Sequence, residues 1–136
     1  MLNEPEWPDA TEIIQLNRLI VQETGEPHLL MSKPGLESAC ARPHNLWVYQ
    51  DEYRLAYLGA ALICAIGRNH PFEQGNKRTA LGAAIIFFEN NGHVFDHPDT
   101  EDFAPLIIDV IAGDETEEVL AEELDLYLVE ELFDLG

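Results

Sequence analysis

The chain alternates between segments in which apolar residues recur every three or four positions and short polar segments rich in proline, glycine or asparagine. This spacing places the apolar side chains of each segment on one face of a helix. It predicts helices over residues 9–24, 34–42, 51–68, 77–91, 100–112 and 115–133. The helix over 77–91 is apolar nearly all round, so we expect it to be central. The pattern therefore predicts an all-α fold, a helical bundle with two central helices over 51–68 and 77–91.

The segment after residue 42 is the one place where the pattern predicts extended backbone. Pro43 is expected to end the second helix, because a proline inside a helix removes a hydrogen bond and clashes with the preceding turn. Aromatic and β-branched residues follow, and they favour extended conformations: Trp47, Val48 and Tyr49. We interpret this segment as a short strand or β flap between two helices.

Length and composition limit the number of domains and the location that we expect for the protein. With 136 residues and 46% apolar content, the chain is long enough for one packed core. We therefore expect a single domain over residues 1–136. No stretch approaches the roughly 20 apolar residues that cross a bilayer, and residues 1–8 lack the features of a signal peptide. We expect a cytoplasmic protein with no membrane contact.

The net charge of −19 limits the partners of the protein. A surface this acidic repels phosphate backbones, so direct binding of nucleic acid is not expected. Adaptation to salt and pairing with a basic partner would both explain the charge, and composition does not choose between them.

Cysteines and scattered histidines carry no recognisable chemistry. Cys40 and Cys64 lie in apolar helical patterns without metal-ligand or CxxC spacing, so we interpret them as buried free thiols. Four histidines fall in predicted loops, again without metal-ligand spacing: His28, His44, His93 and His97. We assign them no functional role.

Residues 68–78, between the two central helices, combine features that are locally unfavourable. Three of the seven basic residues lie here: Arg68, Lys77 and Arg78. Pro71 moves His70 away from the helical conformation and ends the preceding helix. Lys77 and Arg78 fall in the first turn of the next helix, where the positive pole of the helix dipole disfavours cations by roughly 0.3–1 kcal/mol each. This arrangement requires a compensating interaction.

A bound anion would supply that interaction. Gly75 allows close approach of the backbone, and Asn76 is a preferred N-cap from which the next helix begins with free N–H groups. Together with Lys77 and Arg78, these groups predict a phosphate site. His70 lies a few residues upstream, and its imidazole is suited to take a proton from an attacking hydroxyl. The segment predicts group transfer from a polyphosphate.

The same residues resemble the signature of the Fic family, HxFx(D/E)GNxR, through His70, Phe72, Gly75, Asn76 and Arg78. The death-on-curing (Doc) branch is similar at Lys77, at the following residues 79–81, and upstream over 36–43. The likeness covers about residues 30–92. It implies an all-helical fold in which His70 is the base and Phe72 anchors the loop in the core. It also implies a phosphate site formed by Gly75, Asn76, Lys77 and Arg78.

The resemblance implies transfer from ATP to a hydroxyl of a target protein. Fic proteins ordinarily transfer AMP, whereas the Doc branch transfers the γ-phosphate to a threonine of elongation factor Tu. The chain has Lys77 where the AMP-transferring proteins carry glycine, and Leu81 where they carry a second arginine. Both differences favour a Doc-like kinase toxin. Adenylylation of a protein hydroxyl is the alternative.

The metal site departs from the family pattern. Gln74 occupies the position of the acidic residue that holds Mg²⁺, so the site lacks a formal charge. The amide oxygen of Gln74 or the carboxylate of Glu73 could serve as a hard ligand instead. A degenerate, non-catalytic binding module is therefore a third hypothesis.

Two further expectations follow from the resemblance. The chain contains no inhibitory motif, in which a serine or threonine is followed four positions later by glutamate and then by glycine or asparagine. This absence fits a toxin that is controlled by a separate antitoxin protein. Trp47, Val48 and Tyr49 resemble in position the flap that aligns target peptides by strand addition.

Overall fold

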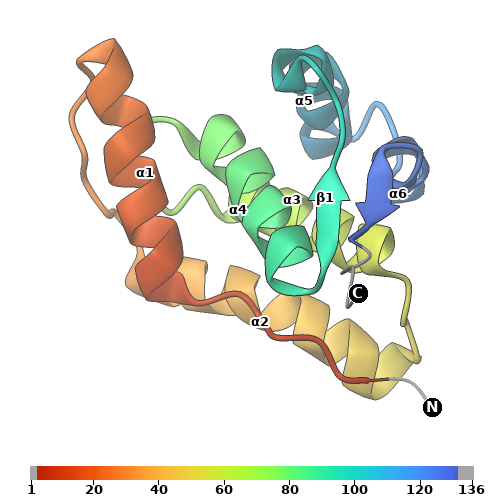
Figure 1. Cartoon of the computed structure of the whole chain (residues 1–136). Helices are drawn as coiled ribbons and strands as arrows, with labels where there is room; N and C mark the ends of the chain where they lie inside the picture. The colour runs from red at the N-terminus through yellow and green to blue at the C-terminus, as the bar shows by residue number, and fades with distance from the viewer. Residues whose placement is uncertain (1–2, 132–136) are drawn as a thin grey trace, which may run out of the picture.

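A computed structural model of the protein describes residues 3–131. Figure 1 shows α4 between α1 on one side and α5 and α6 on the other, with α2 crossing below them. The elements, in chain order, are α1 (Ala10–Thr24), α2 (Lys33–Gln50), α3 (Leu55–Asn69), α4 (Asn76–Asn90), β1 (His93–Phe95), the 3₁₀ helix η1 (Thr100–Phe103), α5 (Ala104–Ala112), α6 (Glu117–Asp125) and β2 (Leu128–Glu130). The predicted helical class is confirmed.

The core forms around α3, in which every residue over 58–66 is buried. This helix packs against α2, α4 and α6. At Gly59 the backbone of α3 lies so close to α4 that an added Cβ would be 2.4 Å from the Phe88 ring. The predicted pair of central helices is therefore α3 and α4, and the loop that joins them carries the signature residues.

Both cysteines are free and buried, as predicted. Burial raises the pKa of the Cys40 thiol to about 11 and that of Cys64 to about 12. Because a thiolate is the reactive form, these side chains behave as small apolar groups of the core.

The predicted end of the second helix at Pro43 is wrong, and so is the predicted strand at Trp47, Val48 and Tyr49. The helix α2 continues through Pro43 to Gln50. Pro43 is buried and extends the inward stripe of Leu36, Ala39 and Cys40. Packing of this stripe on α3 outweighs the local cost of a proline, which is about 3 kcal/mol.

The last predicted helix is also shorter than expected. It ends at Asp125, and residues 128–130 form β2, which pairs antiparallel with β1 with Val94 opposite Val129. Tyr127, between α6 and β2, packs its ring edge-on against His97 and Phe103. The sheet therefore joins β1, which follows α4, to β2 near the end of the described residues. The end of the predicted helix, residues 132–133, lies outside the described residues.

Over residues 3–131, none of the helices combines the length and the apolar character needed to cross a membrane.

Candidate active site

The loop between α3 and α4 begins at a strained residue, His70. This residue is the C-cap of α3 and has a φ of 48°, in the left-handed region. A residue with a Cβ pays roughly 1–2 kcal/mol there, so the surroundings must hold it in place. The backbone N–H of His70 donates to the carbonyl of Ile66 at 3.0 Å. The imidazole itself is exposed, at the protein surface.

Phe72 anchors the loop, as predicted, because its side chain is completely buried. An extended segment that precedes α2 runs antiparallel to the loop. In it, Met31 donates its N–H to the carbonyl of Pro71 at 2.7 Å, and the N–H of Glu73 donates to Leu29 at 2.9 Å. The loop is thus held by burial of Phe72 in the core and by backbone hydrogen bonds to residues 29–31.

Asn76 has a different local role from the one predicted. The N-cap of α4 is Gly75, with a φ of 76°, and Asn76 is the first helical residue. The buried side chain of Asn76 folds back over the loop. Its Oδ1 accepts from the N–H of Phe72 at 3.0 Å, and its Nδ2 donates to the carbonyl of Phe72 at 2.7 Å. Asn76 therefore locks the loop.

These two bonds also determine the protonation pattern of His70. They fix the orientation of the Asn76 amide, whose Nδ2 lies 3.1 Å from Nδ1 of the His70 ring. Since an amide nitrogen only donates, Nδ1 of His70 accepts this bond. The neutral imidazole therefore carries its proton on Nε2, and Nδ1 is the unprotonated nitrogen.

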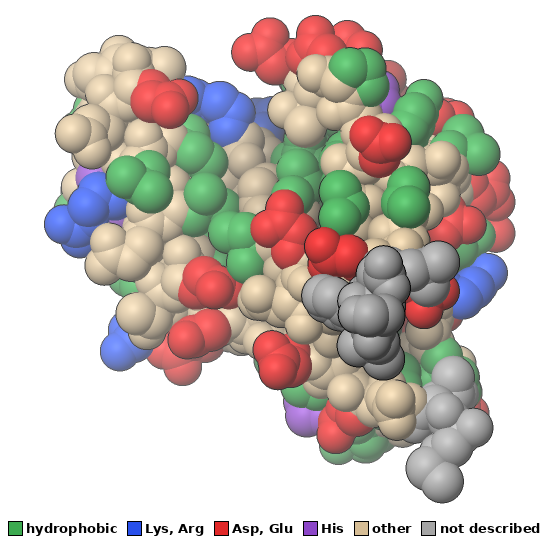
Figure 2. Space-filling view, in the orientation of Figure 1, with side chains coloured by type: hydrophobic (Ala, Val, Ile, Leu, Met, Phe, Trp, Pro, Cys, Tyr) green, Lys and Arg blue, Asp and Glu red, His purple; other side chains and the backbone are tan. Residues whose placement is uncertain are grey.

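The first turn of α4 presents unpaired donors. Among residues 3–131, no protein acceptor receives the backbone N–H groups of Asn76, Lys77 or Arg78. The side chains of Lys77 and Arg78 are exposed beside them. Figure 2 shows basic side chains at the mouth of the hollow between α1 and α5, while acidic side chains are scattered over the rest of that face. Amides and cations at one helix start form a site suited to phosphate.

Arg68, the third member of the basic group in the sequence, lies elsewhere. Its guanidinium donates to the carbonyl of Val110 at 3.3 Å and lies 3.8 Å from Glu117. Glu117 also forms a bidentate pair with Arg42. Arg68 therefore ties α3 to α5 and α6 and lies outside the predicted phosphate site.

A carboxylate that sequence analysis did not identify already contacts Arg78. Glu26, in the segment after α1, lies 2.5 Å from Nη2 of Arg78 and also accepts from the hydroxyl of Thr24. Hydrogen bonds from Thr24 and Arg78 lower the pKa of the Glu26 carboxyl below its usual value. An anion that binds Arg78 must therefore compete with Glu26. The proximity joins residues 52 positions apart and has no signal in local sequence.

A groove continues from the phosphate site along α4. It has a volume of about 610 Å³, and Lys77 and Arg78 are among the residues that line it. Its walls are mostly apolar, with Ile20 from α1, Leu81 and Ile85 from α4, and Ile107 from α5. The groove therefore combines a mostly apolar wall with charged residues of both signs, Lys77 and Arg78 together with Glu23 and Glu101.

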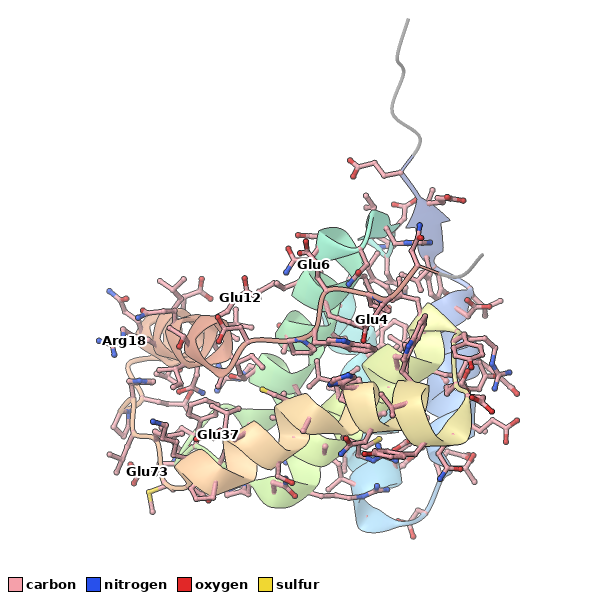
Figure 3. The ribbon with its side chains drawn as sticks, turned by 90° about the horizontal axis from the view of Figure 1, so that it is seen from below. Glu4, Glu6, Glu12, Arg18, Glu37 and Glu73 are labelled. Carbon is pink, nitrogen blue, oxygen red and sulfur yellow. The ribbon has the colours of Figure 1, made fainter. Side chains whose placement is uncertain are left out.

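The residues predicted to hold Mg²⁺ provide few ligands. Gln74 and Glu73 are both exposed, and Figure 3 shows Glu73 at the outer edge of the molecule. Within residues 3–131, no three or more His, Cys, Asp or Glu side chains gather in a way that could hold a metal ion. Mg²⁺ commonly binds through one or two protein ligands plus phosphate oxygens and water. The site fits only such a mode.

The residues predicted as a target flap are not placed for strand addition. Trp47, Val48 and Tyr49 belong to α2, and the Trp47 ring packs edge-on against Tyr53 with 4.8 Å between centroids. A helix has no free strand edge, so this prediction is corrected. The extended backbone beside the loop is that of residues 29–31, where Leu29 and Met31 are exposed.

Comparison with known proteins identifies the family of the chain. The sequence model described as the Fic/DOC family matches residues 7–88. The chain belongs to this family. The match includes the loop, both helices that flank it, and the helix α1 that lies against α4. The similarity that the sequence shows to the Doc branch of the Fic/DOC family is confirmed by two relatives.

Both relatives bear the name Doc. The protein kinase doc of Escherichia phage P1 is 38% identical over 74 residues, which are 53% of this chain and 59% of that protein. Toxin Doc of Mycolicibacterium smegmatis is 45% identical over 58 residues, which are 42% of this chain and 45% of that protein. The chain thus spans about half the length of the curated relatives that it matches.

Proposed function

We propose that the protein is the toxin of a toxin–antitoxin system and acts as an ATP-dependent protein kinase. In this proposal it transfers the γ-phosphate of ATP to a threonine hydroxyl of a target such as elongation factor Tu. The observation that carries it is the side chain of Asn76, which joins His70 to the start of α4 with its free N–H groups. The proposed base therefore lies at the start of the loop, and the proposed anion site lies at its end. The name of one relative, protein kinase doc, supports the reaction class, and the name of the other, Toxin Doc, supports the role as a toxin.

The proton transfer follows from the hydrogen bond between Asn76 and His70. In the structure, Nδ1 of His70 accepts from Asn76. When a phosphate oxygen takes over this donor, Nδ1 becomes free to accept the proton of the target hydroxyl. The hydroxyl oxygen then forms a bond to the γ-phosphorus, the bond to the bridging oxygen breaks, and ADP leaves. Lys77 and Arg78 neutralise charge on the phosphates during this step.

ATP and Mg²⁺ are the proposed cofactors. Gly75, with a φ of 76°, makes the turn that exposes the N–H groups at the start of α4, and a bound Mg²⁺ would neutralise negative charge on the transferred group. Gln74 would supply an amide oxygen and Glu73 a carboxylate, with the remaining ligands from phosphate and water. Because Gln74 lacks a charge, we expect weaker binding of Mg²⁺ than at a site with an acidic residue there.

A separate antitoxin is the proposed regulatory partner. The groove beside Lys77 and Arg78 is mostly apolar and is lined by residues of α1, α4 and α5. We propose that a segment of the antitoxin covers this groove and so blocks access to the phosphate site. A target in translation also implies a cytoplasmic location.

Intact-mass spectrometry tests this function. Elongation factor Tu is incubated with ATP and Mg²⁺, in parallel with the wild-type protein and with the His70→Ala variant. We expect a gain of one phosphate that depends on His70, and tandem spectra that place it on a threonine. A gain of one AMP would replace the kinase with an adenylyltransferase. No gain with this target, or a gain of equal size with His70→Ala, would contradict the proposal.

A further inference from the structure

Beneath the loop lies a completely buried amide, that of Asn17 in α1. Its Nδ2 donates to the backbone carbonyl of Gln74 at 2.8 Å and to Oγ1 of Thr79 at 3.0 Å. Its Oδ1 lies 2.8 Å from Nδ1 of His28. An amide without solvent contact needs all of these partners, because an unpaired buried polar group is costly. Asn17 therefore connects α1 by hydrogen bonds to the start of α4 and to the segment that contains His28.

The direction of each bond is determined by chemistry. The carbonyl of Gln74 can only accept, so the nitrogen of the Asn17 amide must face it. The oxygen then faces His28, whose Nδ1 must carry a proton and donate. Neutral imidazole with its proton on Nδ1 meets this requirement, and so does the charged ring. The Gln74 carbonyl thus determines the orientation of the Asn17 amide, and the N–H of His28 supports it.

The bonds of Asn17 enclose the turn that starts α4. Gln74 and Thr79 lie on either side of Gly75, and the N–H of Thr79 donates to the carbonyl of Gly75 at 2.8 Å. Nδ2 of Asn17 lies 3.4 Å from the point where a Cβ on Gly75 would be. Asn17 thereby sets the angle at which the chain enters α4. It also sets the direction of the free N–H groups that follow Gly75.

We infer that Asn17, supported by the hydrogen bond from His28, is a positioning residue for the anion-binding turn at Gln74 and Gly75. Its importance for transfer rests on the proposed function. Neither residue reaches the reacting atoms, so both act through the turn. The ring of His28 also lies against Phe72, with 6.2 Å between centroids, so the same side chain contacts the anchor of the loop.

Hydrogen exchange provides a test that does not require catalysis. In Asn17→Leu, the amide of Thr79 is expected to exchange at least about tenfold faster, because local opening of the turn becomes easier. The amides of α3 at residues 58–66 should keep wild-type protection. Gln15→Leu, an exposed amide in the same helix, is the matched control and should change neither region. Equal exchange of Thr79 in wild type and Asn17→Leu would overturn the inference, and so would equal acceleration in α3.

A milder pair of variants avoids loss of folding. Thr79→Val removes the hydroxyl that accepts from Asn17 at nearly constant volume, and Thr79→Ser restores a hydroxyl. We expect faster exchange of the Thr79 position in the valine variant and wild-type exchange in the serine variant. His28→Phe, which keeps a ring against Phe72 but removes the N–H donor, should also accelerate exchange. Identical exchange in the valine and serine variants would contradict the role of the hydroxyl.

ATP binding then links the turn to the proposed function. With Mg²⁺ present, Asn17→Leu and Thr79→Val are expected to weaken ATP at least about fivefold, whereas Thr79→Ser should bind as wild type does. If wild type binds and transfers but these variants bind ATP normally, the positioning role is wrong and the proposed function stands. If wild type neither binds ATP nor transfers, the proposed function fails, and the exchange data still decide whether Asn17 positions the turn.

Discussion

The helix α3 and the loop that follows it are held in place by opposite means. Over residues 58–66 every side chain of α3 is buried and apolar. The loop over 70–75 is held mainly by hydrogen bonds, from Asn76 on one side and Asn17 on the other, and by one buried ring, Phe72. Burial of apolar surface holds a segment in place without favouring one orientation of its polar groups, whereas hydrogen bonds also fix the orientation of the groups that form them. A site that must aim N–H groups at an anion needs the second kind of support.

Because of this difference, we expect substitutions in the two regions to affect different properties, stability in α3 and ligand binding or transfer in the loop. Substitutions in α3 should change the free energy of unfolding and leave the chemistry of each folded molecule intact. Substitutions among the polar partners of the loop should mainly change binding and transfer. Phe72 is the exception, because it lies in the loop while its ring is buried in the core, so its truncation should lower stability.

Phe72→Ala should have the largest effect on stability. The side chain is completely buried, and truncation of a buried phenylalanine to alanine costs about 3–5 kcal/mol. Urea unfolding followed by circular dichroism measures the loss. Phe72→Leu, which refills most of the volume, is the control and should lose much less. If Phe72→Ala unfolded at the wild-type urea concentration, the ring would not anchor the loop.

Gly59→Ala should destabilise the contact between α3 and α4. The new Cβ would lie 2.4 Å from the Phe88 ring, which is itself buried and cannot move freely. Overpacking of this kind costs about 1–3 kcal/mol, more than the gain of roughly 1 kcal/mol in helix propensity. Gly82→Ala in α4 is the control, since its Cβ would meet only the end of the Leu16 side chain, at 2.9 Å. Urea unfolding should show a loss for the first variant and no loss for the second.

Arg78→Ala should weaken ATP binding and leave the unfolding transition nearly unchanged. The guanidinium is exposed and lies beside the free amides of α4, so its loss removes charge-assisted bonds to phosphate, worth about tenfold in affinity. Isothermal titration with ATP and Mg²⁺ measures the change. Arg54→Ala removes the same charge far from the loop, where Arg54 pairs with Glu52. Equal losses in the two variants would indicate a general charge effect only.

Glu26→Gln should have the smallest effect, in the opposite direction. The carboxylate of Glu26 pairs with Arg78, and its neutralisation removes a competitor of the phosphate. ATP affinity is expected to rise about two- to fivefold, in line with the modest strength of exposed ion pairs. The gain should vanish when Arg78 is already alanine. A gain that persists there would mean that Glu26 acts through the overall charge.

Local sequence signals were enough for much of this architecture. The apolar period predicted α1, and Asp9 caps it through the N–H of Thr11 while Gly25 ends it in the left-handed conformation. Both helices around the loop were predicted, as was the burial of Phe72. These features depend on residues within a few positions of one another, where propensity and capping act.

Features that depend on distant partners were not predictable in this way. Pro43 continues α2 because α3 packs against it, and residues 128–130 form a strand because β1 offers a partner. Asn17 and Gln74 lie 57 positions apart, so their hydrogen bond leaves no periodic signal. The polar support of the loop is therefore a product of the tertiary fold, although the residues that it supports are visible in the motif.

An amide-resolved NMR titration with ATP and Mg²⁺ tests the central claim most directly. The claim is that the free N–H groups of Asn76, Lys77 and Arg78 receive a phosphate. We expect these three amides to show the largest shifts in the described part of the chain, saturating with one affinity, while residues 58–66 of α3 stay unchanged. Saturable shifts centred on another surface, or no shifts at ATP concentrations that bind the protein, would contradict the claim.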